Sequence, residues 1–307
     1  MSDASVTRLA LVGCTASGKS SVALAVATAL GDLEIVTVDS MQVYRGMDIG
    51  TAKPTPAEQR AVPHHLLDLV DPADEFTVSE FQTAARAAIA DIEARGRRPL
   101  LVGGTGLYLR AVVDDLVIPG QFPVVRTELD AEPDTAGLHE RLQVLDPLAA
   151  SRMEPSNRRR VVRALEVTLG SGRLFSSFGP GLDAYPVTAY DLVGLDRPVE
   201  VLNERVAARY RDQVAAGFVD EVRTLAAAPG GLGRTASQAL GYAELLAVVR
   251  GDCELDEALE LATVRTRRFA RRQRSWFRRD PRLTWFDVGP DPDPAPVVEA
   301  LVRRWAR

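Results

Sequence analysis

The feature that most constrains this chain is an eight-residue glycine-rich pattern near its start. The pattern runs Gly13-Cys14-Thr15-Ala16-Ser17-Gly18-Lys19-Ser20 and matches the P-loop at every fixed position. It lies where a P-loop must lie, between an apolar strand-like run (residues 9–12) and a helix-like stretch (residues 19–30). Its backbone amides, the helix N-terminus and the Lys19 ammonium can together bind a diphosphate. The Ser20 hydroxyl is then the expected ligand for Mg²⁺.

Short apolar segments alternate with helical segments through the first third of the chain. Residues 34–38 and 100–102 have the length and composition of buried strands, and residues 81–95 have helical spacing. This alternation predicts an α/β fold, namely a P-loop NTPase-like parallel sheet flanked by helices. Ligands of such sheets bind beyond the carboxyl ends of the strands. The P-loop, residues 39–42 and residues 103–106 should therefore meet there.

The pattern changes at about residue 118. Strand-like runs disappear and helical spacing dominates up to about residue 186, with Pro and Gly at the helix ends. We predict a helical insertion (residues 118–189) between two parts of a catalytic core (residues 1–117 and 190–307). A strand over residues 190–195 should return the chain to the sheet. The rest should form a helical C-terminal part, with helices over residues 199–217, 218–227, 236–250 and 255–279.

Composition excludes several classes of protein. No apolar run reaches the roughly 18 residues that a membrane span needs, and the start of the chain, with acidic Asp3, is typical of a strand and not of a signal peptide. Cys14 and Cys253 are the only cysteines, so neither a disulfide framework nor a cysteine zinc site fits. We expect a cytoplasmic protein with no membrane association and no obligate protein partner.

Polar residues outside the P-loop leave several roles open. Asp39 follows the second predicted strand, where it can be a Mg²⁺ ligand, a general base acting on an acceptor, or a helix N-cap. The adjacent His64 and His65 cannot share one face of a strand or helix and have no partner at metal-ligand spacing, so we expect structural roles for them. We expect His139 at the surface.

Further blocks of the chain resemble the successive signatures of bacterial tRNA dimethylallyltransferases. They occur in the family's order and, with the P-loop, extend from residue 13 to about residue 286. The blocks are Asp39-Ser40-Met41-Gln42-Val43-Tyr44, Gly46-Met47-Asp48-Ile49-Gly50-Thr51-Ala52-Lys53-Pro54, Pro63-His64-His65-Leu66-Leu67-Asp68, Gly103-Gly104-Thr105-Gly106-Leu107-Tyr108, Arg163-Ala164-Leu165-Glu166-Val167, Gln238-Ala239-Leu240-Gly241-Tyr242 and Arg272-Gln273 followed by Ser275-Trp276-Phe277.

The resemblance implies transfer of a dimethylallyl group from dimethylallyl diphosphate to an adenine. The target is the exocyclic amine of the adenine 3′ of the anticodon (position 37) in tRNAs that read U-starting codons. The resemblance places Asp39 at that amine, Thr105 against the reacting groups, and Arg205, with Arg209 as a weaker candidate, on the diphosphate. The Thr105 hydroxyl could instead cap the helix that follows its glycine turn. The chemistry agrees, because removal of a proton helps a poor nucleophile to attack. The P-loop amides, Lys19 and Mg²⁺ can stabilise the leaving diphosphate.

Arginine clusters are the candidate contacts to the tRNA anticodon stem-loop. Only Lys19 and Lys53 of the 37 basic residues are lysines, so a coding preference can also explain arginine runs, and a solvated helix face is the alternative. Lys53 has no assigned role. Phe269, Trp276 and Phe277 lie among the C-terminal arginines and can stack on bases or pack in the core. The expected tRNA contacts are Asp39, Ser40, Met41, Gln42, Thr105, Arg158, Arg159, Arg160, Arg163, Arg271, Arg272 and Gln273.

Other functions share some of these features. A P-loop phosphotransferase acting on a small metabolite would use the P-loop and Asp39, but not the basic C-terminal helix. An adenylate isopentenyltransferase would use similar loops without needing the insertion. A non-catalytic tRNA-binding protein would have no use for a complete P-loop.

Overall fold

The computed structural model describes residues 8–289 and 293–306. Residues 1–7, which include Asp3, lie outside these ranges. Residues 290–292 and 307 of the predicted core also lie outside them. None of the described helices is long and apolar enough to cross a bilayer.

A six-stranded parallel sheet forms the centre of the larger unit, as the sequence predicts. Its strand order is β3-β2-β4-β1-β5-β6, so the strand before the P-loop lies inside the sheet. The structure adds two short strands, β3 and β6, to those that the pattern predicts. The strands are β1 (Arg8–Val12), β2 (Leu33–Val38), β3 (His64–His65), β4 (Arg98–Gly103), β5 (Tyr190–Asp196) and β6 (Thr284–Asp287).

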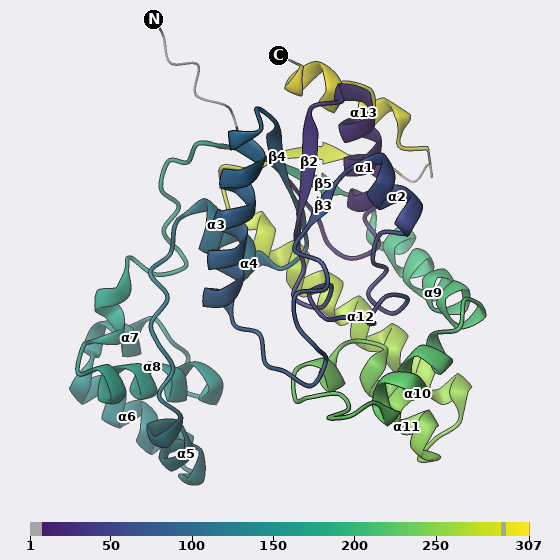
Figure 1. Cartoon of the computed structure of the whole chain (residues 1–307). Helices are drawn as coiled ribbons and strands as arrows, with labels where there is room; N and C mark the ends of the chain where they lie inside the picture. The colour runs from purple at the N-terminus through teal and green to yellow at the C-terminus, as the bar shows by residue number, and fades with distance from the viewer. Residues whose placement is uncertain (1–7, 290–292, 307) are drawn as a thin grey trace, which may run out of the picture. The chain divides into compact units, whose positions relative to one another are not determined.

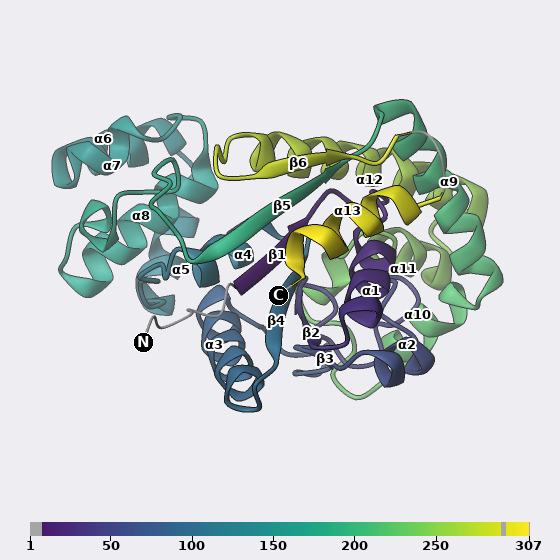
Figure 2. The ribbon, with the colours of Figure 1, turned by 90° about the horizontal axis from the view of Figure 1, so that it is seen from above.

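Helices cover both faces of this sheet because its central strands are apolar on both sides. Leu9 and Leu11 of β1 pack towards α1 (Lys19–Leu30) and α13 (Ala295–Trp305). Ala10 and Val12 pack towards α3 (Val78–Ala94) and α4 (Gly106–Val113). Figure 2 shows α3 and α1 on opposite sides of the strands. A short helix, α2 (Pro56–Ala61), precedes β3.

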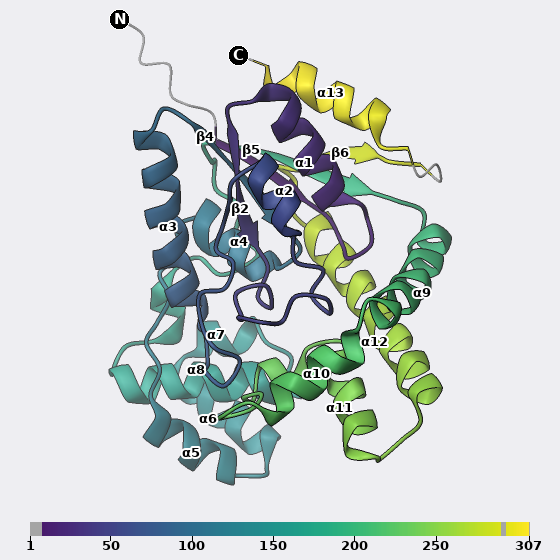
Figure 3. The same cartoon turned by 45° about the vertical axis from the view of Figure 1, so that its right-hand side comes forward.

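The C-terminal part is helical and packs on the loop that follows Asp39. Val43, Tyr44 and Met47 of that loop are fully buried among α9 (Val199–Ala215), α10 (Phe218–Ala227), α11 (Tyr242–Arg250) and α12 (Leu255–Arg278). These helices lie together in Figure 1 and Figure 3. These residues form a third apolar cluster, beyond the carboxyl ends of the strands.

The single helix predicted over residues 236–250 is wrong. A 3-10 turn (Ala236–Gln238) is followed by α11, which begins only at Tyr242. Gly241 interrupts the helix with φ +86°, and a Cβ there would lie 2.8 Å from Phe218. The glycine is needed for this close approach, which helical spacing alone does not reveal.

Residues 114–186 form a separate compact unit, close to the predicted insertion at 118–189. It consists of α5 (Pro123–Ala131), α6 (Thr135–Leu145), α7 (Pro147–Ser151), α8 (Arg158–Ser171) and a 3-10 turn (Phe175–Phe178). The unit has its own core, built around Leu142 and Val161. His139 is buried in it and its Nε2 lies 3.3 Å from the Ala150 carbonyl, so the predicted surface position is wrong.

Candidate active site

The P-loop leaves a helix N-terminus open. Gly18 is the N-cap of α1, with φ +96° and no side-chain capping hydrogen bond. The first amides of an α-helix have no partner within it, so those of α1 remain available to an anion. Ala16 also has positive φ (+65°), an uncommon conformation for a residue with a Cβ. A Cβ at Gly13 would lie 2.6 Å from Ser17 Oγ, so the loop closes tightly on itself.

Lys19 supplies the positive charge of this loop. Burial lowers its pKa, and the negative charge of Asp39 opposes that shift. Among the described residues, none accepts a hydrogen bond from its ammonium group. A desolvated ammonium without a bonded partner is well placed to bind a phosphate oxygen.

Asp39 has a structural contact on one of its oxygens. Its Oδ1 accepts hydrogen bonds from the amides of Met41 (2.9 Å) and Gln42 (3.4 Å) and so caps the turn after β2. The predicted capping role of Asp39 is therefore observed, but Asp39 caps a turn and not the N-terminus of a helix. Burial lowers the pKa of Lys19 and of Arg209, and the negative charge of the Asp39 carboxylate partly opposes both shifts.

The glycine turn after β4 contacts this loop directly. Thr105 Oγ1 accepts a hydrogen bond from the amide of Ser40 (3.2 Å), and the Thr105 amide donates to the Val38 carbonyl (3.3 Å). Thr105 also precedes α4, whose Leu109 amide donates to its carbonyl. Its hydroxyl thus joins two loops and does not cap the helix that follows.

Gln273 of α12 links the same turn to the P-loop. Its Oε1 accepts from the Thr15 amide (2.9 Å), and its Nε2 donates to the Gly104 carbonyl (2.8 Å). The predicted convergence of the three loops is confirmed. Gln273 is only 8% exposed and both ends of its amide are bonded inside the fold. The structure therefore gives this residue an internal role, and its expected tRNA contact stays a prediction.

Two arginines of α9 reach the P-loop. Arg205 Nε donates to the Ala16 carbonyl (2.9 Å). Arg209 donates to Thr15 Oγ1 (3.1 Å) and to the Gly50 carbonyl (3.0 Å), and burial lowers its pKa. The sequence favoured Arg205 for the diphosphate, and Arg209 also contacts the P-loop, so both guanidinium groups lie beside it.

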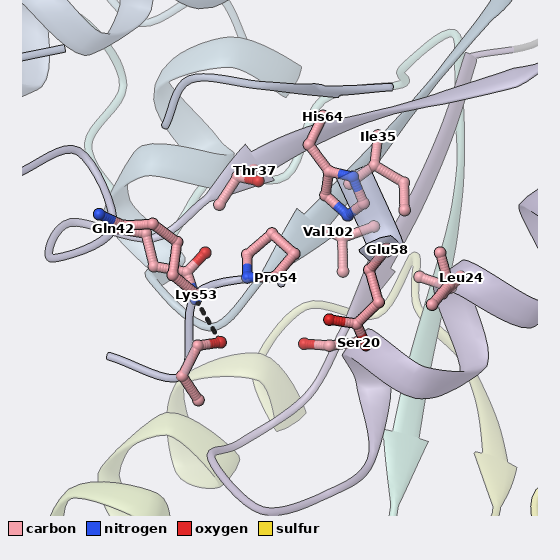
Figure 4. A pocket seen from close by; sticks show the side chains of 12 residues that line it. Ser20, Leu24, Ile35, Thr37, Gln42, Lys53, Pro54, Glu58, His64 and Val102 are labelled. Carbon is pink, nitrogen blue, oxygen red and sulfur yellow. Dashed lines mark hydrogen bonds between the residues drawn. The ribbon is translucent and has the colours of Figure 1, made fainter. Parts of the chain in front are cut away.

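A cavity of about 80 Å³ lies beside the exposed Ser20 (Figure 4). Thr37, Gln42, Lys53 and His64 contribute to its lining. Gln42 is fixed there because its Nε2 donates to the carbonyls of Thr51 (3.0 Å) and Ala52 (3.2 Å). The Ser20 hydroxyl is therefore accessible from the cavity, on the side where the P-loop would hold its ligand.

Lys53 has a structural role that its motif did not reveal. Its side chain is 4% exposed, and its ammonium contacts Asp48 (2.5 Å), Asp68 (2.6 Å) and the Tyr44 carbonyl (2.9 Å). Because three separate parts of the loop bind one cation, Lys53 fixes the shape of the segment that follows Asp39. The two carboxylates and the carbonyl that bind Lys53 could not be inferred from the spacing of residues in the sequence.

The insertion arginines divide into two groups. Arg158 donates to the carbonyls of Leu129 and Asp130, and Arg163 pairs with Glu166 (2.7 Å). Those two guanidinium groups stabilise the insertion itself, whereas Arg159 and Arg160 are exposed. The tRNA contacts of all four arginines stay predictions, and two of the guanidinium groups are already bonded within the insertion.

The arginines of α12 divide in the same way. Arg274 pairs with Asp196 (2.9 Å), and Arg265 with Glu244 (2.6 Å), while Arg271 and Arg272 are exposed. Phe277 is 2% exposed and belongs to the core, so it cannot stack on a base.

A Mg²⁺ ion would need ligands beyond the protein. Among the described residues, no group of three His, Cys, Asp or Glu side chains could hold a metal. This fits an ion of the P-loop kind, which takes most ligands from phosphate and water and one from a hydroxyl such as that of Ser20.

Comparison with known proteins agrees with this geometry. Residues 42–280 match the model of the IPP transferase family, and residues 7–71 match that of isopentenyl transferase. The chain is 50% identical to a tRNA dimethylallyltransferase of Kineococcus radiotolerans, over 98% of this chain and 97% of that protein. It is 51% identical to one of Streptomyces coelicolor, over 92% and 90%.

Solved structures give the same assignment. A full-length tRNA isopentenylpyrophosphate transferase from Bacillus halodurans is 37% identical, with a TM-score of 0.70 and 97% and 95% coverage of the two chains. A eukaryotic dimethylallyltransferase described as acting on tRNA is 26% identical, with a TM-score of 0.76 and coverage of 92% and 74%. This chain belongs to the tRNA dimethylallyltransferase family.

Proposed function

We propose that this protein transfers a dimethylallyl group from dimethylallyl diphosphate to the exocyclic amine of adenine 37 in tRNAs that read U-starting codons. As a member of its family the chain is a tRNA-modifying prenyltransferase. The observation that carries the transfer chemistry is that hydrogen bonds of Gln273 and Thr105 link the P-loop, whose helix is uncapped, to the loop that holds Asp39. One side can hold an anionic leaving group while the other receives a proton.

The P-loop amides and Lys19 would bind the diphosphate, and Arg205 and Arg209 stand beside the same loop. The bond between the allylic carbon and the diphosphate oxygen breaks, and the bond from that carbon to the adenine nitrogen forms. Charge that develops on the departing oxygen is stabilised by fixed donors, which need no rearrangement during the reaction. When bound at Ser20, Mg²⁺ would supply further positive charge to the diphosphate.

The carboxylate of Asp39 would take the proton that leaves the adenine amine. Its Oδ1 is held by the turn, which fixes the direction of the other oxygen. The adenine must leave its stack to reach this carboxylate, as a flipped base does. Ser40 and Met41 follow Asp39 directly and are placed to contact that base, and Thr105 is fixed beside them. Exposed Arg159, Arg160, Arg271 and Arg272 are the proposed phosphate contacts.

Incubation with unmodified tRNA, dimethylallyl diphosphate and Mg²⁺ tests the proposal. Mass analysis of the nucleosides should show a five-carbon unit on adenosine, and release of pyrophosphate should match it one to one. A parallel reaction with γ-labelled ATP should transfer no label to any acceptor. Label transfer without prenylated adenosine would instead support a phosphotransferase. We also propose that the enzyme acts in the cytoplasm, where its tRNA substrate is available.

A further inference from the structure

The side chain of Gln273 occupies the space between two loops that meet at the site. It comes from α12, more than 160 residues away in sequence from either loop, with a separation of 258 from Thr15 and 169 from Gly104. The oxygen of the Gln273 amide accepts a hydrogen bond from the Thr15 amide of the P-loop. Its nitrogen donates to the Gly104 carbonyl of the glycine turn. An apolar side chain of the same length could fill this space but could make neither hydrogen bond.

The linkage continues to the acceptor side. Thr105, next to Gly104, accepts a hydrogen bond from the amide of Ser40, which directly follows Asp39. A connected path therefore runs from Thr15 through Gln273 and the glycine turn to Asp39. It joins the loop that would hold the diphosphate to the residue that would receive the proton.

There is little freedom in this contact. A Cβ on Gly104 would lie 2.5 Å from Gln273 Nε2, and a Cβ on Gly106 would lie 2.1 Å from Trp276 Nε1. Gln273 and Trp276 are nearly one turn apart on α12, so the helix presses on the turn at two successive points. A Cβ at either glycine would displace the side chain of α12 that faces it, and the Gln273 amide sets the spacing between the loops.

We propose that Gln273 is a positioning residue that sets the separation between the P-loop and the turn carrying Thr105, and that it does not contact tRNA. The inference rests on the proposed prenyl transfer. Group transfer between two bound partners depends steeply on alignment, and a shift of about 1 Å can cost about 100-fold in rate. Loss of this spacer should therefore lower turnover more than the binding of either partner.

The variant Gln273→Met tests this directly because it keeps the length and removes both hydrogen bonds. We expect kcat at saturating substrates to fall about 10- to 100-fold. The dissociation constants for tRNA alone and for magnesium pyrophosphate alone should change less than about threefold. The matched control is Gln82→Met, which removes another buried amide, bonded to the Ala111 carbonyl away from the site. It should lower the thermal midpoint similarly and keep kcat.

A kcat for Gln273→Met within twofold of the wild type would overturn the inference. So would a defect confined to tRNA affinity, which would make Gln273 a tRNA contact. If Gln273→Met fails to fold, Gly104→Ala displaces the same amide from the other side and should give the same separation of kcat from binding. If the wild-type protein forms no prenylated adenosine in tRNA, the proposed function itself is refuted, and this inference is refuted with it.

Discussion

At the scale of single residues, the two oxygens of Asp39 can serve different purposes. Oδ1 accepts two backbone hydrogen bonds and shapes the turn, and the remaining oxygen is available for chemistry. The sequence predicts both a capping and a catalytic role for this position but cannot show that they coexist. The geometry allows the two roles to be separated by substitution.

Asp39→Asn should keep the cap, because its amide oxygen still accepts, and should lose the base. We expect kcat to fall by at least about 100-fold, with tRNA affinity and thermal midpoint near those of the wild type. Single-turnover prenylation and filter binding measure the two effects. Asp39→Ala serves as the comparison, since it removes the cap as well and should also lower stability by about 1 kcal/mol. Normal turnover in Asp39→Asn would exclude Asp39 as the base.

Binding of the anionic diphosphate should raise the pKa of Lys19, which burial lowers in the free protein. Its pKa in the folded protein is lowered, so between that pKa and the higher one of the unfolded chain the folded protein binds fewer protons. Stability of the free protein should therefore rise with pH across this window through Lys19, and diphosphate binding should take up protons there. Calorimetry in two buffers of different ionisation enthalpy measures the uptake.

The control for this measurement is Lys19→Met, which should bind pyrophosphate more weakly and without that uptake. The same variant should raise the Michaelis constant for dimethylallyl diphosphate and lower turnover. Equal proton uptake in wild type and variant would assign the titration to another group.

At the scale of elements, the irregular segment over residues 48–50 is fixed by hydrogen bonds to a helix. Glu221 of α10 accepts hydrogen bonds from three successive amides, those of Asp48, Ile49 and Gly50, at 2.7–3.2 Å, and from the Tyr242 hydroxyl. A Cβ on Gly50 would lie 2.3 Å from Phe218. The segment after Asp39 is thus fixed by distant helices and not by its own secondary structure.

Glu221→Ala should leave these amides without an acceptor and lower the free energy of unfolding by about 2 kcal/mol. Denaturant titration measures the change. Asp220→Ala on the same helix is the matched control, because Asp220 is exposed and pairs only locally with Arg223. It should change stability by less than about 0.5 kcal/mol. Equal effects of the two substitutions would mean that Glu221 does not hold the segment.

The sequence predicts elements well where local pattern and tertiary context agree. β1, α1, β2, β4 and β5 follow from buried apolar runs and glycine ends, and the P-loop follows from its motif. β3 is two residues long and exists because it pairs with β2, so no periodicity marks it. The roles of Glu221 and Gln273 depend on contacts over long sequence separations, which a single sequence does not display. The role of Lys53 depends on how an irregular segment folds around it, which has no periodic pattern.

At the scale of the whole molecule, the insertion is a self-contained unit that carries charge on its surface. Its core is apolar, and Arg158 and Arg163 are used to hold its helices. Arg159 and Arg160 at the start of α8 remain exposed. As proposed phosphate contacts, these two arginines should contribute part of the salt-dependent affinity for tRNA.

The double substitution Arg159→Met with Arg160→Met should weaken tRNA binding and reduce the slope of log affinity against log salt by up to about 2. Filter binding between low and moderate salt measures the slope. Arg163→Met is the control, since its guanidinium group pairs with Glu166, and it should lower stability without changing the slope. An unchanged slope in the double variant would remove the pair from the interface.

The hydrogen bond between Thr188 Oγ1 and the Val113 carbonyl (3.3 Å) joins the residues that flank the insertion. The chain thus departs from the end of α4 and comes back to the start of β5 at nearly the same point. Lengthening, shortening or exchanging the intervening stretch alters no strand pairing. Sequence changes within this stretch can therefore remodel the surface of the insertion without disturbing the sheet that carries the P-loop.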